Sequence, residues 1–169
     1  AKHQWSAAPM GEHIQTNDAV APQSIINPAR HTDVVGYVQE ATTEQVEQAL
    51  NNAQAVQDIW ARTAKDTRAS YLLRAADLME ARLEELMVLL CRESGKTYAN
   101  AIAEVREAVD FLRYYATQMI DLDANAEVEP LGTMLCISPW NFPLAIFTGQ
   151  VAAALVAGNT VIAKPAEQT

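Results

Sequence analysis

Three polar residues follow two short apolar runs in the C-terminal part of the sequence. Asn141 comes four residues after an apolar run over 133–137, and Lys164 and Glu167 stand at and just beyond the end of a second run over 160–163. A side-chain amide can donate a hydrogen bond to a developing oxyanion, a contribution of about 3–4 kcal/mol in known active sites. A lysine ammonium beside a carboxylate can bind ribose hydroxyls or phosphate. These residue types indicate a site that binds a ligand and stabilises negative charge.

The segments around these residues predict a strand, a helix and a second strand. Residues 133–137 carry four apolar side chains in five positions, which is typical of a strand buried on both faces. Pro143 suits the first turn of a following helix over 144–157, and Gly158 suits the end of that helix. Residues 160–163 are mostly β-branched and predict the second strand. Two short apolar strands joined by a buried helix predict a parallel pair with a right-handed crossover.

The predicted pair of strands would bring the three polar residues to one crevice. In open α/β sheets, ligands bind beyond the carboxyl ends of the strands, and neighbouring strands lie about 5 Å apart. On spacing alone, a structural interpretation also stays open for each residue. Asn141 suits a plain turn, Lys164 suits a solvated strand end, and Glu167 suits a first helical turn, where an acid compensates the helix dipole.

The composition is that of a globular protein with an excess of acidic residues. The chain has 169 residues, half of them apolar, with a formal net charge of −9 and a pI near 4.7. This balance argues against a nucleic-acid surface, which needs clustered lysine and arginine. No apolar run approaches the roughly 18 residues of a membrane span, and the N-terminus lacks the apolar segment of a secretory signal. The first residue is not methionine, so we interpret the sequence as a piece of a longer chain.

The sequence contains no recognisable metal or phosphate motif. Cys91 continues a helical apolar face and Cys136 lies in a strand run, so we interpret both as buried structural thiols. His3, His13 and His31 form no ligand pair, and we assign no metal site. None of the glycines forms a G-x-G-x-x-G motif or a P-loop.

An arm, a hairpin and a helical region precede the strand–helix–strand unit. Residues 1–24 have few periodic positions and several turn-forming residues, so we expect an irregular arm or linker. Residues 24–28 and 33–40 predict a β-hairpin. The expected helices begin at a capping box at Thr42, span about 66–95 with a break near Arg82, and span about 98–122.

Two motifs of this sequence resemble the aldehyde dehydrogenase superfamily. The first is Ile-Ser-Pro-Trp-Asn-Phe-Pro over 137–143, and the second is Gly-Asn-Thr-Val-Ile-Ala-Lys-Pro-Ala-Glu over 158–167. Residues 27–29 and 93–96 are also similar to segments of that superfamily. The resemblance covers roughly residues 25–169.

The resemblance implies a fold class and a division of the chain. Residues 107–111 and 145–149 are most similar to glutamate-semialdehyde dehydrogenases, and the arm with Trp5 resembles the join between the halves of bacterial bifunctional proline-utilisation enzymes. The implied fold is α/β and aldehyde dehydrogenase-like, with arm and hairpin, a helical layer, and the first βαβ unit of a Rossmann-type parallel sheet. Residues 25–169 would form the N-terminal part of an NAD-binding domain, and 1–24 an arm or inter-domain linker.

The resemblance also implies a role for each residue near the predicted crevice. Asn141 would donate its amide to the oxyanion of the thiohemiacetal that forms when a catalytic cysteine attacks the aldehyde. The backbone of 137–140 would line the cofactor cleft, and Glu107 would face the amino group of the substrate. The implied binding residues are Ile137, Ser138, Pro139, Trp140, Lys164 and Glu167 for the cofactor, and Phe142 and Glu107 for the substrate.

The implied reaction is the NAD-dependent oxidation of L-glutamate γ-semialdehyde to glutamate, the second step of proline catabolism. Glu167 favours NAD over NADP, because a carboxylate suits a free ribose hydroxyl and repels a 2′-phosphate. FAD would be needed only if a proline dehydrogenase half precedes this segment. The implied partners are the aldehyde, the rest of the same polypeptide and further copies of the parent enzyme. The implied location is cytoplasmic, with peripheral attachment to the inner membrane left open.

One departure from the family limits the predicted activity. In the family, the nucleophilic cysteine and the general-base glutamate lie downstream of the second motif, and neither Cys91 nor Cys136 matches the nucleophile's motif. We therefore expect this segment alone to be inactive. Two alternatives stay open, namely another aldehyde specificity such as succinate semialdehyde, and a non-catalytic interaction module with unpaired strand edges.

Overall fold

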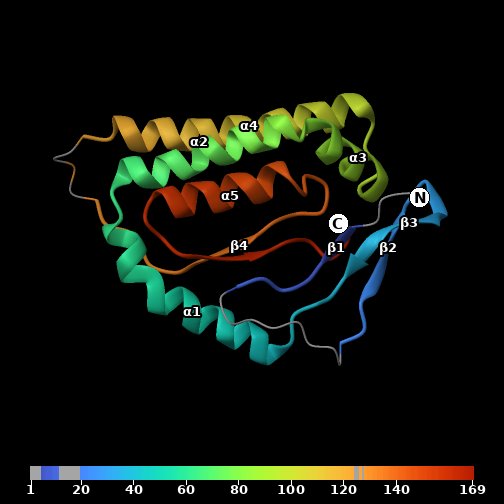
Figure 1. Ribbon diagram of the computed structural model, residues 1–169, viewed down its shortest axis with the longest axis horizontal. Helices are drawn as coiled ribbons and strands as arrows, with labels where there is room; N and C mark the ends of the chain where they lie inside the picture. The colour runs from blue at the N-terminus through green and yellow to red at the C-terminus, as the bar shows by residue number, and fades with distance from the viewer. Residues whose placement is uncertain (1–4, 12–19, 124–125, 127) are drawn as a thin grey trace.

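The computed structural model describes residues 5–11, 20–123, 126 and 128–169 (Figure 1). In chain order the elements are β1 (Trp5–Ala7), β2 (Gln23–Asn27), β3 (Arg30–Val38), α1 (Thr43–Arg62), α2 (Lys65–Ala81), α3 (Leu83–Glu93), α4 (Tyr98–Asp121), β4 (Met134–Ile137), α5 (Ala145–Val156) and β5 (Val161–Lys164). The first three strands form one sheet and the last two form another. Helices α1 to α4 separate the two sheets in the sequence, and α5 joins β4 to β5, so the class is mixed α/β.

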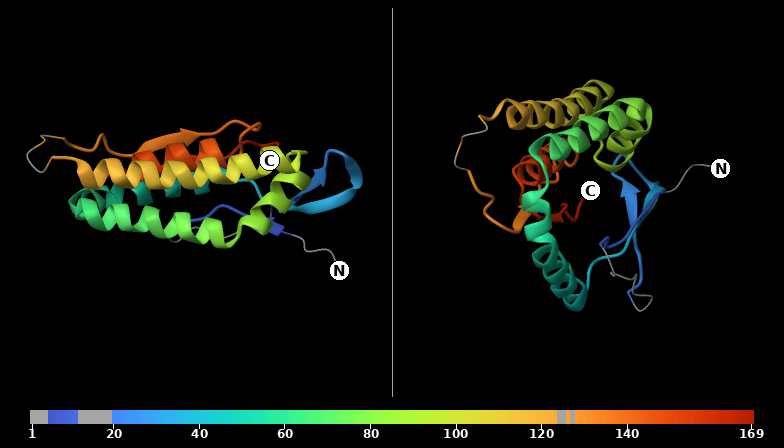
Figure 2. Two further views of the ribbon diagram at one scale, coloured as in Figure 1. Left: turned by 90° about the horizontal axis from the view of Figure 1, so that it is seen from above. Right: turned by 60° about the vertical axis from the view of Figure 1, so that its left-hand side comes forward.

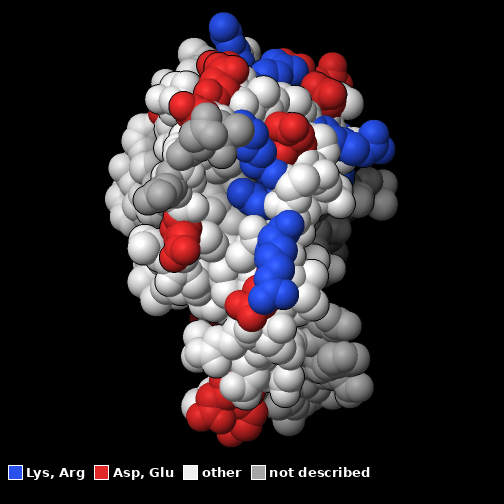
Figure 3. Space-filling view, turned by 90° about the vertical axis from the view of Figure 1, so that its left-hand side faces the viewer, with Lys and Arg blue, Asp and Glu red and all other residues white. Residues whose placement is uncertain are grey.

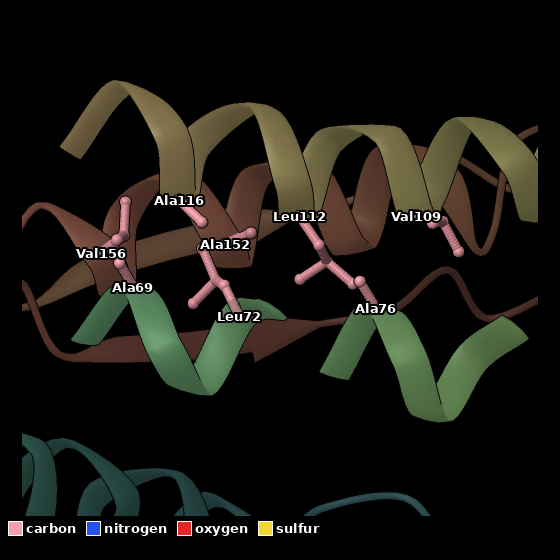
Figure 4. Packing of buried hydrophobic residues seen from close by; sticks show 8 residues of the cluster. All are labelled: Ala69, Leu72, Ala76, Val109, Leu112, Ala116, Ala152 and Val156. Carbon is pink, nitrogen blue, oxygen red and sulfur yellow. The ribbon is translucent and has the colours of Figure 1, made fainter. Parts of the chain in front are cut away.

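Helix α5 lies between a pair of long helices and the two-stranded sheet (Figure 1). α2 and α4 pack against each other and against α5, while β4 and β5 lie on the other side of α5. The side chains at the centre of the helical layer are aliphatic and many are small, which lets the helices approach closely: Ala69, Leu72, Ala76, Val109, Leu112, Ala116, Ala152 and Val156 (Figure 4). Truncating a buried leucine to alanine typically costs about 2–5 kcal/mol. This cluster therefore fixes α5 in place.

The parallel pair of strands predicted from the sequence is confirmed. β4 and β5 pair in parallel, with Ile137 opposite Lys164. The predicted burial of the first strand on both faces is wrong, because Leu135 is 63% exposed and Ile137 57%, whereas Cys136 is buried. Successive side chains of a strand point to opposite faces. The face with Cys136 is covered, and the face with Leu135 and Ile137 is open to solvent in the described part of the chain.

The N-terminal arm contains a strand that the sequence did not predict. β1 pairs in parallel with β3, with Trp5 opposite Gly36. A Cβ atom at Gly36 would lie 2.3 Å from the backbone oxygen of Trp5, so the close approach of these strands requires a glycine. The expectation of an irregular arm over 1–24 is therefore wrong at 5–7, because the pairing partner of this strand is distant in sequence. Residues 1–4 and 12–19 lie outside the described part.

The hairpin and the helices follow the predictions closely. β2 and β3 pair antiparallel, and Arg92 of α3 holds the hairpin by an ion pair to Asp33 with 2.9 Å between Nη2 and Oδ1. At the start of α1, Thr42 Oγ1 accepts from the N–H of Gln45 at 3.3 Å, while Gln45 Oε1 accepts from the N–H of Thr42 at 2.8 Å. This is the predicted capping box. The predicted break also occurs, because Arg82 separates α2 from α3.

The outer elements extend away from the packed helices. α1 and the three-stranded sheet lie on the side of β4 and β5, away from α2 and α4 (Figure 2). On the face shown in Figure 3, acidic side chains lie among the basic ones. None of the helices in the described ranges is both long enough and apolar enough to cross a membrane.

Candidate active site

The turn between β4 and α5 carries the predicted oxyanion donor. Asn141 lies on this turn with an exposed side chain. Its amide makes no hydrogen bond to another residue in the described part of the chain. The backbone N–H of Ser138 donates to the carbonyl of Lys164 at 3.2 Å, which fastens the start of the turn to β5. An exposed amide on a fastened turn is available to a ligand.

A buried carboxylate from α4 caps the first turn of α5. Leu144 is the residue before the helix and has no capping side chain of its own, and Pro143 precedes the helix instead of lying in its first turn. Glu104, which is 2% exposed, accepts with Oε1 from the N–H of Leu144 at 2.9 Å and of Ala145 at 3.3 Å. These are N–H groups that a helix start leaves unpaired. The negative charge also faces the positive end of the helix dipole.

Lys96 connects this carboxylate to the turn. Its Nζ lies 2.6 Å from Oε2 of Glu104, and its side chain is only 12% exposed. The same Nζ lies 4.4 Å from the centroid of the Phe142 ring, where the negative face of an aromatic ring attracts a cation. Phe142 directly follows Asn141 in the chain. One ammonium therefore contacts both the capping carboxylate and the neighbour of the predicted donor.

The predicted cofactor residues gather at the carboxyl ends of β4 and β5. Lys164 Nζ lies 2.7 Å from Oε1 of Glu167, and both side chains are exposed. The hydrogen bond from Lys164 lowers the pKa of Glu167 below its ordinary value, so this carboxylate is charged at neutral pH. Of the remaining predicted cofactor residues, Ile137 and Trp140 are exposed, Pro139 is half-buried and Ser138 is buried. Ser138 Oγ has no hydrogen-bond partner among the described residues.

Glu107 lies on the exposed surface of α4. It lines an open groove of about 820 Å³ along α4, together with Ile102, Phe111 and Tyr114. Phe142 is not among the residues that line this groove. Glu107 is exposed and lies one helical turn beyond Glu104. Its substrate role stays a prediction.

Side chains from α1 and α2 hold the other end of α5. A helix end leaves its last carbonyls unpaired. Three donors meet carbonyls there: Arg68 Nε to Val156 at 2.8 Å, Trp60 Nε1 to Leu155 at 2.9 Å, and Gln57 Nε2 to Gly158 at 3.0 Å. Arg68 also donates to the carbonyls of Ala61 and Thr63. Burial lowers the pKa of Arg68, but a guanidinium stays charged at any physiological pH.

Neither cysteine has the surroundings of a nucleophile. Cys136 is buried and Cys91 is half-buried. Burial raises the pKa of both thiols, whereas a reactive cysteine needs a lowered one. Within the described ranges, no three His, Cys, Asp or Glu side chains come together as a possible metal site, and His3 and His13 lie outside those ranges.

Sequence reasoning assigned no role to Glu104 or Lys96. Glu104 carries an acid within the buried face of α4, between Ala101 and Ala108. A glutamate on an apolar helical face is a usable signal, because such a residue is almost never fully buried without a partner. The large apolar residues of α4 do not mark this face, because Ile102 is 39% exposed. Small alanines mark the true face, and they contribute little to a pattern of large apolar residues.

Comparison with known proteins shows the family of this chain. The model of the family described as "Aldehyde dehydrogenase family" matches residues 14–169. The chain belongs to the aldehyde dehydrogenase family. This confirms the family that the motifs at 137–143 and 158–167 predicted, and with it the predicted class of fold.

Two curated relatives share substantial identity with this family member. "Bifunctional protein PutA" of Escherichia coli is 57% identical over 169 residues, which are all of this chain and 13% of that protein. "1-pyrroline-5-carboxylate dehydrogenase" of Anoxybacillus flavithermus is 42% identical over 171 residues, covering 94% of this chain and 33% of that protein. The chain therefore spans only a minor part of the length of these relatives.

A solved structure of an enzyme with the same name as the second relative aligns along most of the chain. It is the 1-pyrroline-5-carboxylate dehydrogenase from Thermus with bound NAD, with a TM-score of 0.85 and 37% identity. The alignment covers 91% of this chain and 32% of that one. The predicted aldehyde dehydrogenase-like fold is thus confirmed for the described part.

Proposed function

We propose that the full-length protein carrying this segment is an NAD-dependent aldehyde dehydrogenase that oxidises L-glutamate γ-semialdehyde to glutamate. Family membership and the names of the two curated relatives support this proposal. The observation that carries it is the exposed Asn141 amide, which makes no hydrogen bond to another described residue and lies on a turn whose first residue, Ser138, is bonded to β5. That amide is therefore available to an external acceptor, as an oxyanion donor must be.

The segment's own residues would contribute binding and charge stabilisation. Asn141 would donate to the carbonyl oxygen as negative charge develops on it, and a donor fixed beforehand needs no reorganisation at that moment. The turn lies at the carboxyl ends of parallel strands, where ligands of α/β sheets bind. NAD, when bound, would accept the hydride. The nucleophile and the general base would come from residues of the full-length protein downstream of this segment.

The residues at the end of β5 fit the ribose of NAD. Lys164 offers ammonium donors and Glu167 an ionised acceptor, both exposed and already held 2.7 Å apart. A ribose with two free hydroxyls can replace that mutual contact with one donor and one acceptor. A 2′-phosphate would meet the charged Glu167 instead, so we propose NAD over NADP. The Thermus relative, whose solved structure has bound NAD, supports this choice.

Replacing Asn141 in the full-length enzyme tests the proposal. Asn141→Ala should lower kcat about 10²–10³-fold, the usual loss for one oxyanion donor, with the KM for NAD changed little. Asn51→Ala is the matched control, because Asn51 is an exposed amide on α1 away from the turn. Steady-state kinetics with glutamate semialdehyde would decide. Unchanged kcat with a collapsed affinity for NAD would contradict the oxyanion role.

The substrate specificity needs a separate test. Succinate semialdehyde lacks the amino group that Glu107 is proposed to face, so a panel of aldehydes on the full-length enzyme distinguishes the two specificities. We expect kcat/KM to be higher for glutamate semialdehyde. A preference for succinate semialdehyde would assign the alternative. A homo-oligomeric parent, a cytoplasmic location and an FAD-binding partner half stay predictions, the last supported by the word "bifunctional" in one relative's name.

A further inference from the structure

We propose that Glu104 and Lys96 position the oxyanion turn, so that the ion pair between them sets the catalytic rate without touching substrate or cofactor. This inference rests on the role proposed for Asn141. It concerns a buried pair to which neither the motifs nor the similarity to known proteins assigned a role. The observation behind it is that both residues contact the segment that carries Asn141.

Glu104 and Lys96 contact the residues that follow Asn141 in the chain. Glu104 holds the backbone of Leu144 and Ala145, and Lys96 lies against the ring of Phe142. On the other side of the turn, the N–H of Ser138 is bonded to β5. Asn141 therefore lies between two fastened points, one made by the sheet and one made by α4.

Burying the charges of Glu104 and Lys96 carries a large desolvation cost, which argues for a role beyond capping the helix. A serine, threonine or aspartate just before α5 would satisfy the same N–H groups locally. The chain instead buries a carboxylate from another helix and a nearly buried ammonium, and such pairs are often replaceable by apolar residues without loss of stability. What a local cap cannot do is fix the turn relative to α4. The ion pair does that, because one partner holds the helix start and the other holds Phe142.

The consequence for the reaction is geometric. An oxyanion donor works only if its N–H is already aimed at the place where charge develops. A misplacement of about 1 Å, even by a mutation far from the chemistry, can cost on the order of 100-fold in rate. Loosening the C-terminal side of the turn would let Asn141 move while leaving Lys164 and Glu167 in place. The rate should fall without a comparable change in cofactor affinity.

The test uses conservative variants of the full-length enzyme. Glu104→Gln keeps the size of the side chain and one oxygen for the N–H groups, but it removes the charge that holds Lys96. Lys96→Met keeps the length of the stem and removes the ammonium. We expect each to lower kcat about 10- to 100-fold and to leave the KM for NAD within about threefold. Glu80→Gln is the control, because Glu80 is a surface glutamate ion-paired to Arg113, and it should change neither constant.

A double-mutant cycle separates positioning from mere support of the fold. If Glu104 acts through Asn141, Glu104→Gln should cost nothing further in kcat once Asn141→Ala is present. Losses that multiply in the double variant would overturn the inference, and so would a Glu104→Gln enzyme with full kcat and only a lower melting temperature. If Asn141→Ala itself keeps full kcat, the proposed oxyanion role is wrong. If Asn141→Ala is impaired and Glu104→Gln is not, only the positioning inference is wrong.

Discussion

The two ends of helix α5 are held by opposite chemistry. At its start, a carboxylate from α4 accepts from two backbone N–H groups. At its end, Arg68, Trp60 and Gln57 donate to backbone carbonyls. An anion at the start and a cation at the end both match the helix dipole, and they satisfy the groups that helix ends leave unpaired.

The difference between the ends lies in what each one adjoins. The start of α5 directly follows the turn that carries Asn141. The end of α5 contacts side chains of α1 and α2, and a short loop at Gly158 connects it to β5. Both ends stabilise the helix, but only the start borders the predicted chemistry. We expect mutations at the end to change stability alone, and mutations at the start to change the rate as well.

Among substitutions that test the difference between the two ends, Arg68→Met in the full-length protein should cause the largest loss of stability. The variant removes a buried guanidinium and leaves several carbonyls unpaired, so it should destabilise the protein by about 2–4 kcal/mol. The kcat of the folded enzyme should stay unchanged. A urea titration combined with kinetics would show both. Arg62→Met, at an exposed ion pair with Asp58, is the control and should cost about 1 kcal/mol or less.

A substitution midway along α5 should affect both ends. A Cβ atom at Gly149 would lie 2.9 Å from Cδ2 of Phe111, so Gly149→Ala should push α5 away from α4. Overpacking of this kind costs about 1–3 kcal/mol, partly offset by the better helix propensity of alanine. We expect a net loss of about 1–2 kcal/mol and a lower kcat, because α4 supplies Glu104. Urea unfolding and kinetics would measure the two effects, and an unchanged kcat would mean that the start of α5 is held independently of its middle.

The smallest effect is expected from Trp60→Phe. Phenylalanine keeps an aromatic ring against Tyr71, which Trp60 stacks on at 6.1 Å between centroids, but it cannot donate to Leu155. Losing one neutral hydrogen bond should cost about 0.5–1 kcal/mol, with kcat unchanged. Thermal unfolding of the variant beside the parent would measure it. A loss of activity in this variant would contradict the expectation that mutations at the end of α5 change stability alone.

The sequence predicted elements that depend on neighbours along the chain. The capping box at Thr42, the break at Arg82 and the parallel pair of β4 and β5 all follow from local spacing. The motif at 137–143 also pointed to the correct family. β1 could not be predicted in this way, because three residues gain their strand character only from β3.

The polar residues of the candidate site could be predicted from the sequence, but the tertiary contacts that hold them could not. Asn141 and Glu167 follow strand ends and Lys164 is the last residue of β5, so their common edge could be inferred. The pairing of Glu104 with the start of α5 could not, because it joins two elements through tertiary contact alone. The exposure of Leu135 was mispredicted for the same reason. An apolar strand does not say which of its faces a neighbour will cover.

Gly36 determines the register in which β1 of the arm pairs with β3. Only a residue without a side chain can lie against the carbonyl of Trp5, and the neighbours of Gly36 are Val35 and Tyr37. Sliding β1 by one residue would place a branched or aromatic side chain where no space exists, and would also turn every side chain of the strand to the opposite face. β1 is therefore restricted to one register, and those amides of 5–7 that face β3 should exchange with deuterium at the rate of β3, as one cooperative unit.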